Sequence, residues 1–299
     1  MNNCVLFSIP GNEKLCHSLA TLLHAEQGQA IIRRFPDGET YVKVLSNVYE
    51  KEAIIVCSLH HPDNKILPLY FLAKTLREFR ASSVTLIAPY LAYMRQDKRF
   101  TDGECISSEL FATLISSSFD KLITIDPHLH RRSSLDEIYS IHTSVLHASP
   151  LISKWIKENI DKPVLIGPDS ESEQWVSKVA NDAGAPFIIL NKIRKGDRNV
   201  EVSVPQVEKY LGHTPILVDD IISTARTMIE TIGHLKNTGM KKPICIGIHP
   251  VMVSRAYTNL MKAGAEKIIT CDSITHSSNG INVDALLADE ICKNCFVVD

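Results

Sequence analysis

Residues 214–229 read Thr-Pro-Ile-Leu-Val-Asp-Asp-Ile-Ile-Ser-Thr-Ala-Arg-Thr-Met-Ile, and this stretch decides the fold. Its apolar start has the composition of a buried strand, and two carboxylates, Asp219 and Asp220, end that run abruptly. Small hydroxyl-bearing residues follow, and a helical pattern of apolar residues then continues to the vicinity of Gly239. The order is strand, acidic pair, small-residue loop and helix, which is typical of an open α/β sheet.

A loop of this composition suits a sugar phosphate. Ligands of open α/β sheets bind at the carboxyl ends of the strands, where a loop that begins a helix offers unpaired backbone N–H groups to an anion. Ser223, Thr224 and Thr227 add hydroxyl donors for phosphate oxygens. Asp219 and Asp220 can accept hydrogen bonds from sugar hydroxyls or bind a hard cation such as Mg²⁺. The competing interpretation is a buried strand followed by an N-capped helix.

Composition limits the classes of protein to consider. The 299 residues are 44% hydrophobic and 22% charged, with a net charge of −2, as in a globular chain of about two domains. No long cluster of Lys and Arg indicates nucleic-acid binding, and no apolar run reaches the roughly 20 residues of a membrane span. No basic residue precedes Lys14, and the eight cysteines are scattered. We therefore expect a cytoplasmic protein without a signal peptide that binds neither nucleic acid nor membrane.

Apolar segments of strand length alternate with helical patterns along almost the whole chain, which predicts mostly parallel sheets with helices on both faces. The pattern runs twice, with Asp126 and Asp219 at corresponding strand ends. We expect an α/β fold of two similar domains, 1–147 and 148–299, with a tail helix in 283–299 that can pack back on the first domain. The expected strands are 4–9, 30–34, 40–45, 53–58, 83–88, 121–126, 163–167, 186–190, 199–204, 214–219, 243–249 and 267–272, and the expected helices are 12–25, 64–80, 105–118, 148–160, 171–183, 226–238, 254–263 and 283–292.

Three further predicted strands end in polar residues. Phe35-Pro-Asp-Gly-Glu39 follows the strand 30–34 and, taken alone, is an ordinary turn. Asp126-Pro-His-Leu-His130 places an acid and two histidines at alternate positions, which can converge on a metal ion when the backbone is extended. Gly167-Pro-Asp169 precedes an acidic stretch that can equally serve as a helix N-cap and first turn.

Two segments carry cations at the expected ligand edge. Asn191-Lys-Ile-Arg194 ends the predicted strand 186–190. Residues 90–102 form a long polar segment with three basic residues, so they are either a clamp on polyphosphate or a solvated surface loop. The chain contains neither GxxxxGK[ST] nor GxGxxG, so a nucleotide would bind without a P-loop or a dinucleotide fingerprint.

Taken in this order, the motifs resemble those of the ribose-phosphate diphosphokinase family, the synthases of phosphoribosyl diphosphate (PRPP), over essentially the whole chain. The segment 214–229 is similar to the PRPP-binding motif that this family shares with phosphoribosyltransferases, whereas the other motifs select the synthase. The resemblance implies two phosphoribosyltransferase-like domains and transfer of the diphosphoryl group of ATP to the 1-hydroxyl of ribose 5-phosphate, giving PRPP and AMP. It also implies Mg²⁺ as cofactor and a homo-oligomer.

The same resemblance implies roles for individual residues. These are ATP binding by Phe35, Asp37, Glu39, Arg95 and Gln96, with Phe35 stacked on the base; catalysis by Lys192, Arg194 and Arg95; metal binding by His128 and Asp169; and ribose 5-phosphate binding by Asp219, Asp220, Ser223, Thr224, Ala225, Arg226 and Thr227.

Two positions depart from the family pattern. Ser223 stands where many members have Asp, and Arg226 stands where they have Gly or another small residue. Ser223 keeps a phosphate donor, while Arg226 either adds a phosphate contact or crowds the turn. Two alternatives therefore stay open, a catalytically silent regulatory subunit and a phosphoribosyltransferase that consumes PRPP. The second would not need the segment 35–39 or the loop 90–102.

Overall fold

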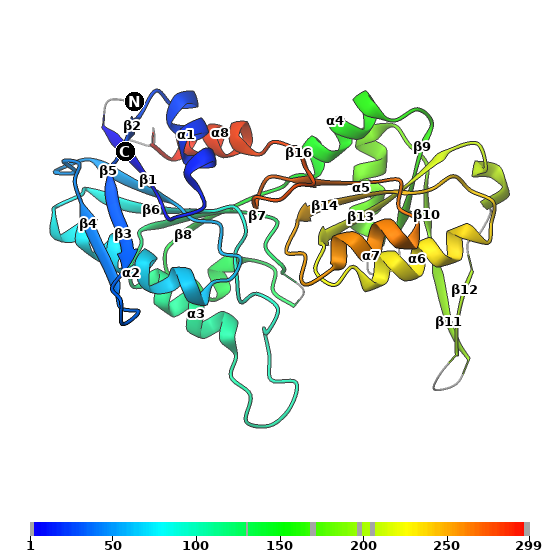
Figure 1. Ribbon diagram of the computed structural model, residues 1–299, viewed down its shortest axis with the longest axis horizontal. Helices are drawn as coiled ribbons and strands as arrows, with labels where there is room; N and C mark the ends of the chain where they lie inside the picture. The colour runs from blue at the N-terminus through cyan, green and yellow to red at the C-terminus, as the bar shows by residue number, and fades with distance from the viewer. Residues whose placement is uncertain (1–2, 130, 168–171, 196–198, 204–206, 296–299) are drawn as a thin grey trace. The chain divides into compact units, whose positions relative to one another are not determined.

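The computed structural model describes residues 3–129, 131–167, 172–195, 199–203 and 207–295. The chain divides into two compact units, the first formed by Met1–Leu146 with Val283–Asp299 and the second by His147–Asn282. Each unit is built on one six-stranded sheet with helices on both faces (Figure 1). The predicted α/β class, with two similar domains of mostly parallel sheet, is confirmed.

In unit 1 the sheet has the order β2-β1-β5-β6-β7-β8, and all of its described pairs are parallel. Helices α1 and α8 cover one face, and α2 and α3 cover the other (Figure 1). A separate antiparallel hairpin is formed by β3 and β4. The elements are β1 (Cys4–Ser8), α1 (Glu13–Leu22), β2 (Glu26–Gln27), β3 (Ala30–Arg34), β4 (Thr40–Val44), β5 (Glu52–Val56), α2 (Asp63–Glu78), β6 (Ser83–Ala88), α3 (Ser107–Ser116), β7 (Lys121–Ile125), a 3₁₀ turn (Leu135–Glu137), β8 (His142–Leu146) and α8 (Asp284–Cys295).

Unit 2 repeats this plan with the sheet order β10-β9-β13-β14-β15-β16 and with β11 and β12 as its separate antiparallel hairpin. Helices α4 and α5 lie on one face of the sheet, and α6 and α7 lie on the other (Figure 1). The elements are α4 (Ser149–Asn159), β9 (Pro163–Gly167), α5 (Glu173–Ala183), β10 (Phe187–Ile189), β11 (Asn191–Lys195), β12 (Asn199–Ser203), a 3₁₀ turn (Val207–Tyr210), β13 (Thr214–Ile221), α6 (Arg226–Lys236), β14 (Ile244–His249), α7 (Ala256–Ala263), β15 (Lys267–Cys271) and β16 (Asn279–Ile281).

The central strands are apolar along their length because helices cover both faces of each sheet. Residues 53–56 of β5 and 164–166 of β9 are fully buried. Each unit has its own core cluster, and that of unit 1 is centred on side chains such as Phe7, Leu72 and Leu86. Burial of these apolar faces is what holds each sheet and its helices together.

Both sheets contain a topological switch point. In unit 1 the chain adds β2 on one side of β1 and then crosses to the other side for β5, and in unit 2 it does the same with β10, β9 and β13. Open α/β sheets bind ligands at the carboxyl ends of the strands beside such a point. The acidic pair Asp219 and Asp220 lies at the carboxyl end of β13, beside the switch point of unit 2.

The structure corrects the predicted strands in two respects. Strands β2, β8 and β16 were not expected, because all three are sheet edges whose residues are largely polar or partly exposed. Residues 191–194, expected as the end of the strand 186–190, form a strand of their own, β11, paired with β12.

The tail helix α8, which the sequence analysis expected to be able to pack back on the first domain, groups with unit 1. The Ser18 hydroxyl of α1 donates to the Asp284 carboxylate of α8 at 2.5 Å.

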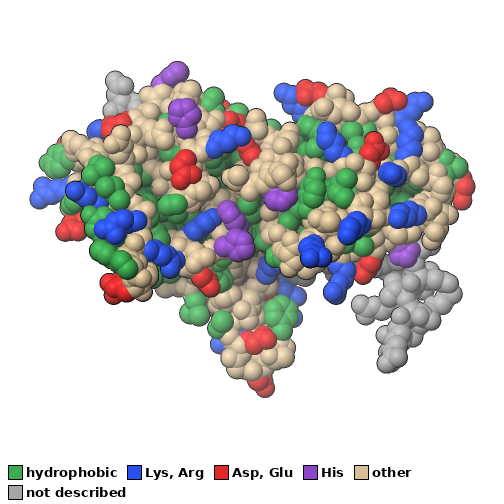
Figure 2. All heavy atoms as spheres, viewed as in Figure 1, with side chains coloured by type: hydrophobic (Ala, Val, Ile, Leu, Met, Phe, Trp, Pro, Cys, Tyr) green, Lys and Arg blue, Asp and Glu red, His purple; other side chains and the backbone are tan. Residues whose placement is uncertain are grey.

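None of the helices in the described part of the chain is long and apolar enough to cross a membrane. On the face drawn in Figure 2, the basic and acidic side chains of the described residues are interspersed over both units.

Candidate functional site

The loop after β13 is held firmly at the edge of the unit 2 sheet. Strand β13 pairs with β9 on one side and with β14 on the other, where Asp219 lies opposite Gly247. Beyond the strand, the Ile222 N–H donates to the His249 carbonyl at 3.0 Å, and the Val253 N–H donates to the Ser223 carbonyl at 3.2 Å. The acidic pair and the hydroxyl residues are therefore presented by a rigid scaffold.

Close packing explains the small residues around this loop. A Cβ atom at Gly247 would lie 2.6 Å from Ile222 side-chain atoms, so only glycine lets the loop lie against β14. Ala225 has a φ of 59°, in the left-handed region that favours glycine. Such a conformation costs about 1–3 kcal/mol for other residues and clusters at ligand sites. The left-handed conformation of Ala225 forms the turn from the loop into α6.

The electrostatics of the loop favour an anion. The loop surrounds an open hollow of about 80 Å³, lined by Asp219, Ile221, Ile222, Ser223, Thr224, Ala225, Arg226, Thr227 and Met228. Helix α6 begins at the exposed Arg226 and has no acidic residue in its first turn. A cation at a helix N-terminus opposes the helix dipole. A bound phosphate would complement both the dipole and the arginine at the helix end of the loop, whereas Asp219 and Asp220 carry the negative charge of its strand end.

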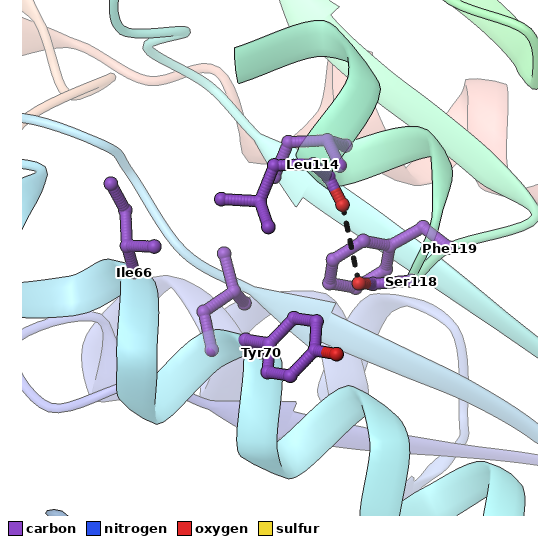
Figure 3. Close-up of a pocket in the computed structure, with 7 residues that line it drawn as sticks. Ile66, Tyr70, Leu114, Ser118 and Phe119 are labelled. Atoms are coloured by element: carbon purple, nitrogen blue, oxygen red, sulfur yellow. Dashed lines mark hydrogen bonds between the residues drawn. The ribbon is translucent and has the colours of Figure 1, made fainter. Parts of the chain in front are cut away.

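A second hollow, between α2 and the segment from α3 to β7, does not have the chemistry of an active site (Figure 3). It has a volume of about 10 Å³ and is lined by Ile66, Leu69, Tyr70, Leu114, Ile115, Ser118 and Phe119. Its serine already donates to the Leu114 carbonyl at 3.2 Å. No charged side chain lines it, so the loop after β13 is the stronger candidate for a charged substrate.

The segment 35–39, which the resemblance assigned to ATP binding, forms the turn of the β3–β4 hairpin in unit 1. The Phe35 N–H donates to the Glu39 carbonyl at 2.8 Å, and the Asp37 carboxylate accepts from the Glu39 N–H at 3.1 Å. The Phe35 ring is 39% exposed, with the Tyr41 ring edge-on at 5.5 Å and the Arg33 guanidinium 4.7 Å from its centroid. The hairpin therefore displays an aromatic face to solvent, as a stacking platform for a base requires.

The segment 90–102 is anchored at its start and projects from unit 1 beyond that (Figures 1 and 2). The Tyr93 hydroxyl donates to the Asp63 carboxylate, and burial and this acid raise the pKa of Tyr93 to about 12. The Gln96 side-chain carbonyl accepts from the Ser107 hydroxyl at 3.2 Å. Between these two anchors the Arg95 side chain is exposed.

The proposed metal segment follows β7, where His128 is half-buried and Asp126 has a left-handed φ of 37°. Asp169 lies outside the described residues. Among the residues that are described, no group of three or more His, Cys, Asp or Glu side chains could hold a metal ion. Mg²⁺ in nucleotide enzymes is usually held by one or two carboxylates together with substrate phosphates, so a site for it does not require a complete cage of protein ligands.

The two proposed catalytic cations lie on β11 of the unit 2 hairpin. In the register of this hairpin, Lys192 lies opposite Val202 and Arg194 lies opposite Val200. The sequence reasoning placed both at a strand end, whereas the structure places them on an antiparallel arm outside the parallel sheet.

Two functional candidates were missed from the sequence. Arg131 and Arg132 follow the Asp126-Pro-His128 segment, and their guanidinium groups bond to Asp97, Glu109 and Glu137. The sequence did contain a feature that could have identified them, namely two adjacent arginines directly after a predicted metal-binding segment.

The fold and the loop after β13 define a class, proteins built from phosphoribosyltransferase-type domains. The family model for the N-terminal domain of ribose phosphate pyrophosphokinase matches residues 4–118, and the phosphoribosyl transferase domain model matches residues 134–289. The chain is 31% identical to the ribose-phosphate pyrophosphokinase of Methanothermobacter thermautotrophicus, over 95% of this chain and 99% of that protein. It is 30% identical to ribose-phosphate pyrophosphokinase 2 of Archaeoglobus fulgidus, over 94% and 98% respectively. The chain belongs to the ribose-phosphate pyrophosphokinase family, so the resemblance inferred from its motifs is confirmed.

A solved structure supports the fold. The phosphoribosylpyrophosphate synthetase from Mycobacterium smegmatis superimposes with a TM-score of 0.86 at 24% sequence identity, covering 98% of this chain and 99% of that one.

Proposed function

We propose that this chain is an active ribose-phosphate pyrophosphokinase, which transfers the diphosphoryl group of ATP to the 1-hydroxyl of ribose 5-phosphate and releases PRPP and AMP. The observation that carries the proposal is the loop after β13, where Asp219 and three hydroxyl side chains line a hollow at the switch point of unit 2. Family membership over nearly the whole chain supports it independently.

Within this proposal the loop binds ribose 5-phosphate. Backbone N–H groups and the hydroxyls of Ser223, Thr224 and Thr227 would donate to the 5-phosphate. Asp219 and Asp220 would accept hydrogen bonds from the ribose hydroxyls. Ala225 would hold the left-handed turn that aims these groups at the phosphate.

The remaining roles concern ATP. Attack of the sugar hydroxyl on the β-phosphorus needs in-line positioning and positive charge where the phosphate oxygens gain negative charge. We assign that charge to Lys192, Arg194 and Arg95. The exposed ring of Phe35 would stack on adenine, with Asp37 and Glu39 at the base edge and Gln96 at the phosphates.

Mg²⁺ completes the proposed set. When bound, it supplies positive charge on the diphosphoryl oxygens. We propose His128 and Asp169 as its protein ligands. A chelator such as EDTA should abolish turnover, and added Mg²⁺ should restore it.

The alternatives make different predictions. A phosphoribosyltransferase would consume PRPP with a base and would not need the N-terminal domain that residues 4–118 match. A silent regulatory subunit would bind substrates without turning them over. One assay with ATP, Mg²⁺ and ribose 5-phosphate, with AMP and PRPP measured together, separates the synthase from both alternatives, and a second assay with PRPP and a nucleobase separates the alternatives from each other. Equal formation of AMP and PRPP is expected, whereas formation of neither would refute the proposal.

The family resemblance also suggests a homo-oligomer in the cytoplasm. Light scattering of the purified protein tests self-association, and fractionation of the producing cell tests location.

Arg226→Gly should leave the enzyme active, with a KM for ribose 5-phosphate that is unchanged or raised severalfold. Arg226 is exposed at the first position of α6, where it can reach the 5-phosphate or extend into solvent. Steady-state kinetics of the wild type and the variant give the answer. A silent wild type that this substitution activates would show instead that Arg226 blocks the loop, and the regulatory-subunit hypothesis would take over.

A further inference from the structure

An ion pair with a buried carboxylate joins two segments of unit 1 that the proposed function uses. The Arg131 Nη1 atom lies 2.9 and 3.2 Å from the two carboxylate oxygens of Asp97. The Asp97 side chain is only 4% exposed, whereas the Arg131 side chain is 39% exposed, so Arg131 reaches from the surface to a carboxylate that is largely removed from water. An exposed ion pair contributes little to structure, but loss of one partner of a buried pair leaves the other charge uncompensated.

The neighbouring arginine extends the connection. The Arg132 side chain is 14% exposed, and its Nη2 atom donates to the Glu109 carboxylate at 2.8 Å and approaches the Asp97 carbonyl oxygen at 3.5 Å. Its Nη1 atom lies 3.8 Å from the Glu137 carboxylate. Arg132 thus links the start of α3, the 3₁₀ turn Leu135–Glu137 and the backbone of the projecting loop.

Asp97 is close in sequence to the proposed ATP-binding residues Arg95 and Gln96. Asp97 is two residues after Arg95, and Arg131 is three residues after His128. The Tyr93 and Gln96 anchors hold the segment from the side of α2 and α3, and the Asp97–Arg131 pair holds it from the side of the segment after β7. The backbone is therefore held on both sides of Arg95, while the Arg95 side chain itself is exposed.

We propose that Arg131, assisted by Arg132, is a positioning residue that acts through Asp97 to hold Arg95 and Gln96 in register with the His128 segment for ATP. Arg131 itself need not touch the substrate. The role in ATP use rests on the proposed function, whereas the anchoring of the loop does not.

The main test compares Arg131→Gln with the wild type. Misplacing a substrate-contacting group by about 1 Å can cost roughly 100-fold in rate, so we expect kcat/KM for ATP to fall about 10- to 100-fold, mainly through KM for ATP. The KM for ribose 5-phosphate should change little, because its loop belongs to unit 2. Arg131→Lys keeps the charge and should recover part of the loss. Asp97→Asn should resemble Arg131→Gln, and the double variant should be little worse than either single one, because both remove one interaction.

Arg77→Gln is the matched control. Arg77 also bonds an aspartate of unit 1, with a 2.8 Å contact to Asp120, and is about as exposed as Arg131. The Asp120 carboxylate, however, is 38% exposed where that of Asp97 is 4% exposed, and this pair lies outside the loop. If the Arg131 pair serves only stability, the two substitutions will have the same kinetic signature, with both KM values unchanged. That result, or an equal rise of both KM values in Arg131→Gln, would overturn the proposal.

Trypsin cleavage supplies a readout that does not need activity. Without nucleotide, Arg131→Gln should be cut at Arg95, Lys98 and Arg99 several times faster than the wild type or Arg77→Gln, as measured by mass spectrometry. If the wild type makes no PRPP, the proposed function fails, yet this comparison still tests the anchor. Unchanged cleavage rates would show that the ion pair does not hold the loop. Should Arg131→Gln fail to fold, Arg131→Lys provides the same comparison with a milder change.

Discussion

Lys192→Ala is expected to lower kcat by about 100-fold or more while the affinity for ribose 5-phosphate stays near that of the wild type. Removal of one electrostatic stabiliser of a transition state typically costs this much. The proposed charge of Lys192 matters most while the diphosphoryl group moves, so its loss should appear in turnover and not in ground-state binding. Steady-state kinetics give kcat, and calorimetry with ribose 5-phosphate gives the affinity.

Lys178→Ala is a suitable control for this experiment. Lys178 is an exposed lysine on α5 in the same unit, so its removal changes the net charge equally and should leave kcat unaltered. Arg194→Ala, on the same strand as Lys192, should show a loss of similar kind. Near-normal turnover in Lys192→Ala would remove this residue from the catalytic set and would leave Arg95 and Arg194 as the cationic candidates.

The loop after β13 was predictable because every feature of it is local. An apolar strand, two acids, small hydroxyl residues and a helix follow one another within residues 214–229, and the structure has them in that order. The left-handed conformation of Ala225 was not predictable, since this region of backbone conformation is associated with glycine.

The hairpin that carries Lys192 was harder to predict. Its first strand reads Asn-Lys-Ile-Arg-Lys, which has too few apolar residues for a strand of a buried parallel sheet. Only one residue separates β11 from β10, so the sequence pattern does not show where one strand ends and the next begins. Such an arm is stabilised by its own antiparallel pairing, which leaves no strong apolar pattern.

The Asp97–Arg131 pair could not be found from the sequence at all. The two residues are 34 positions apart and belong to segments without regular periodicity. Only the order of β6 and β7 as neighbours in the sheet brings the two following loops together. Long-range pairing of side chains is therefore the part of the site that needed the fold.

Asp219→Asn is expected to raise the KM for ribose 5-phosphate about 10- to 100-fold with the fold intact, because a hydrogen bond to a charged group contributes roughly 1.5–3 kcal/mol. The Asp219 side chain lines the hollow of the loop. An amide has one acceptor oxygen where the carboxylate has two, and its NH₂ group cannot accept from a sugar hydroxyl. Kinetics and calorimetry with ribose 5-phosphate measure the effect.

Asp220→Asn should have the smaller effect of the two. One Asp220 carboxylate oxygen already accepts from the Ile221 N–H at 2.8 Å, a bond that an asparagine oxygen can keep. Glu230→Gln, at an exposed position on α6, is the control for loss of one acidic charge in the same region. If added Mg²⁺ restored the Asp219→Asn variant, the acid pair would act through the metal. Unchanged affinity in both aspartate variants would show that the two carboxylates do not bind ribose and only stabilise the end of β13. The ribose hydroxyls would then donate to other acceptors.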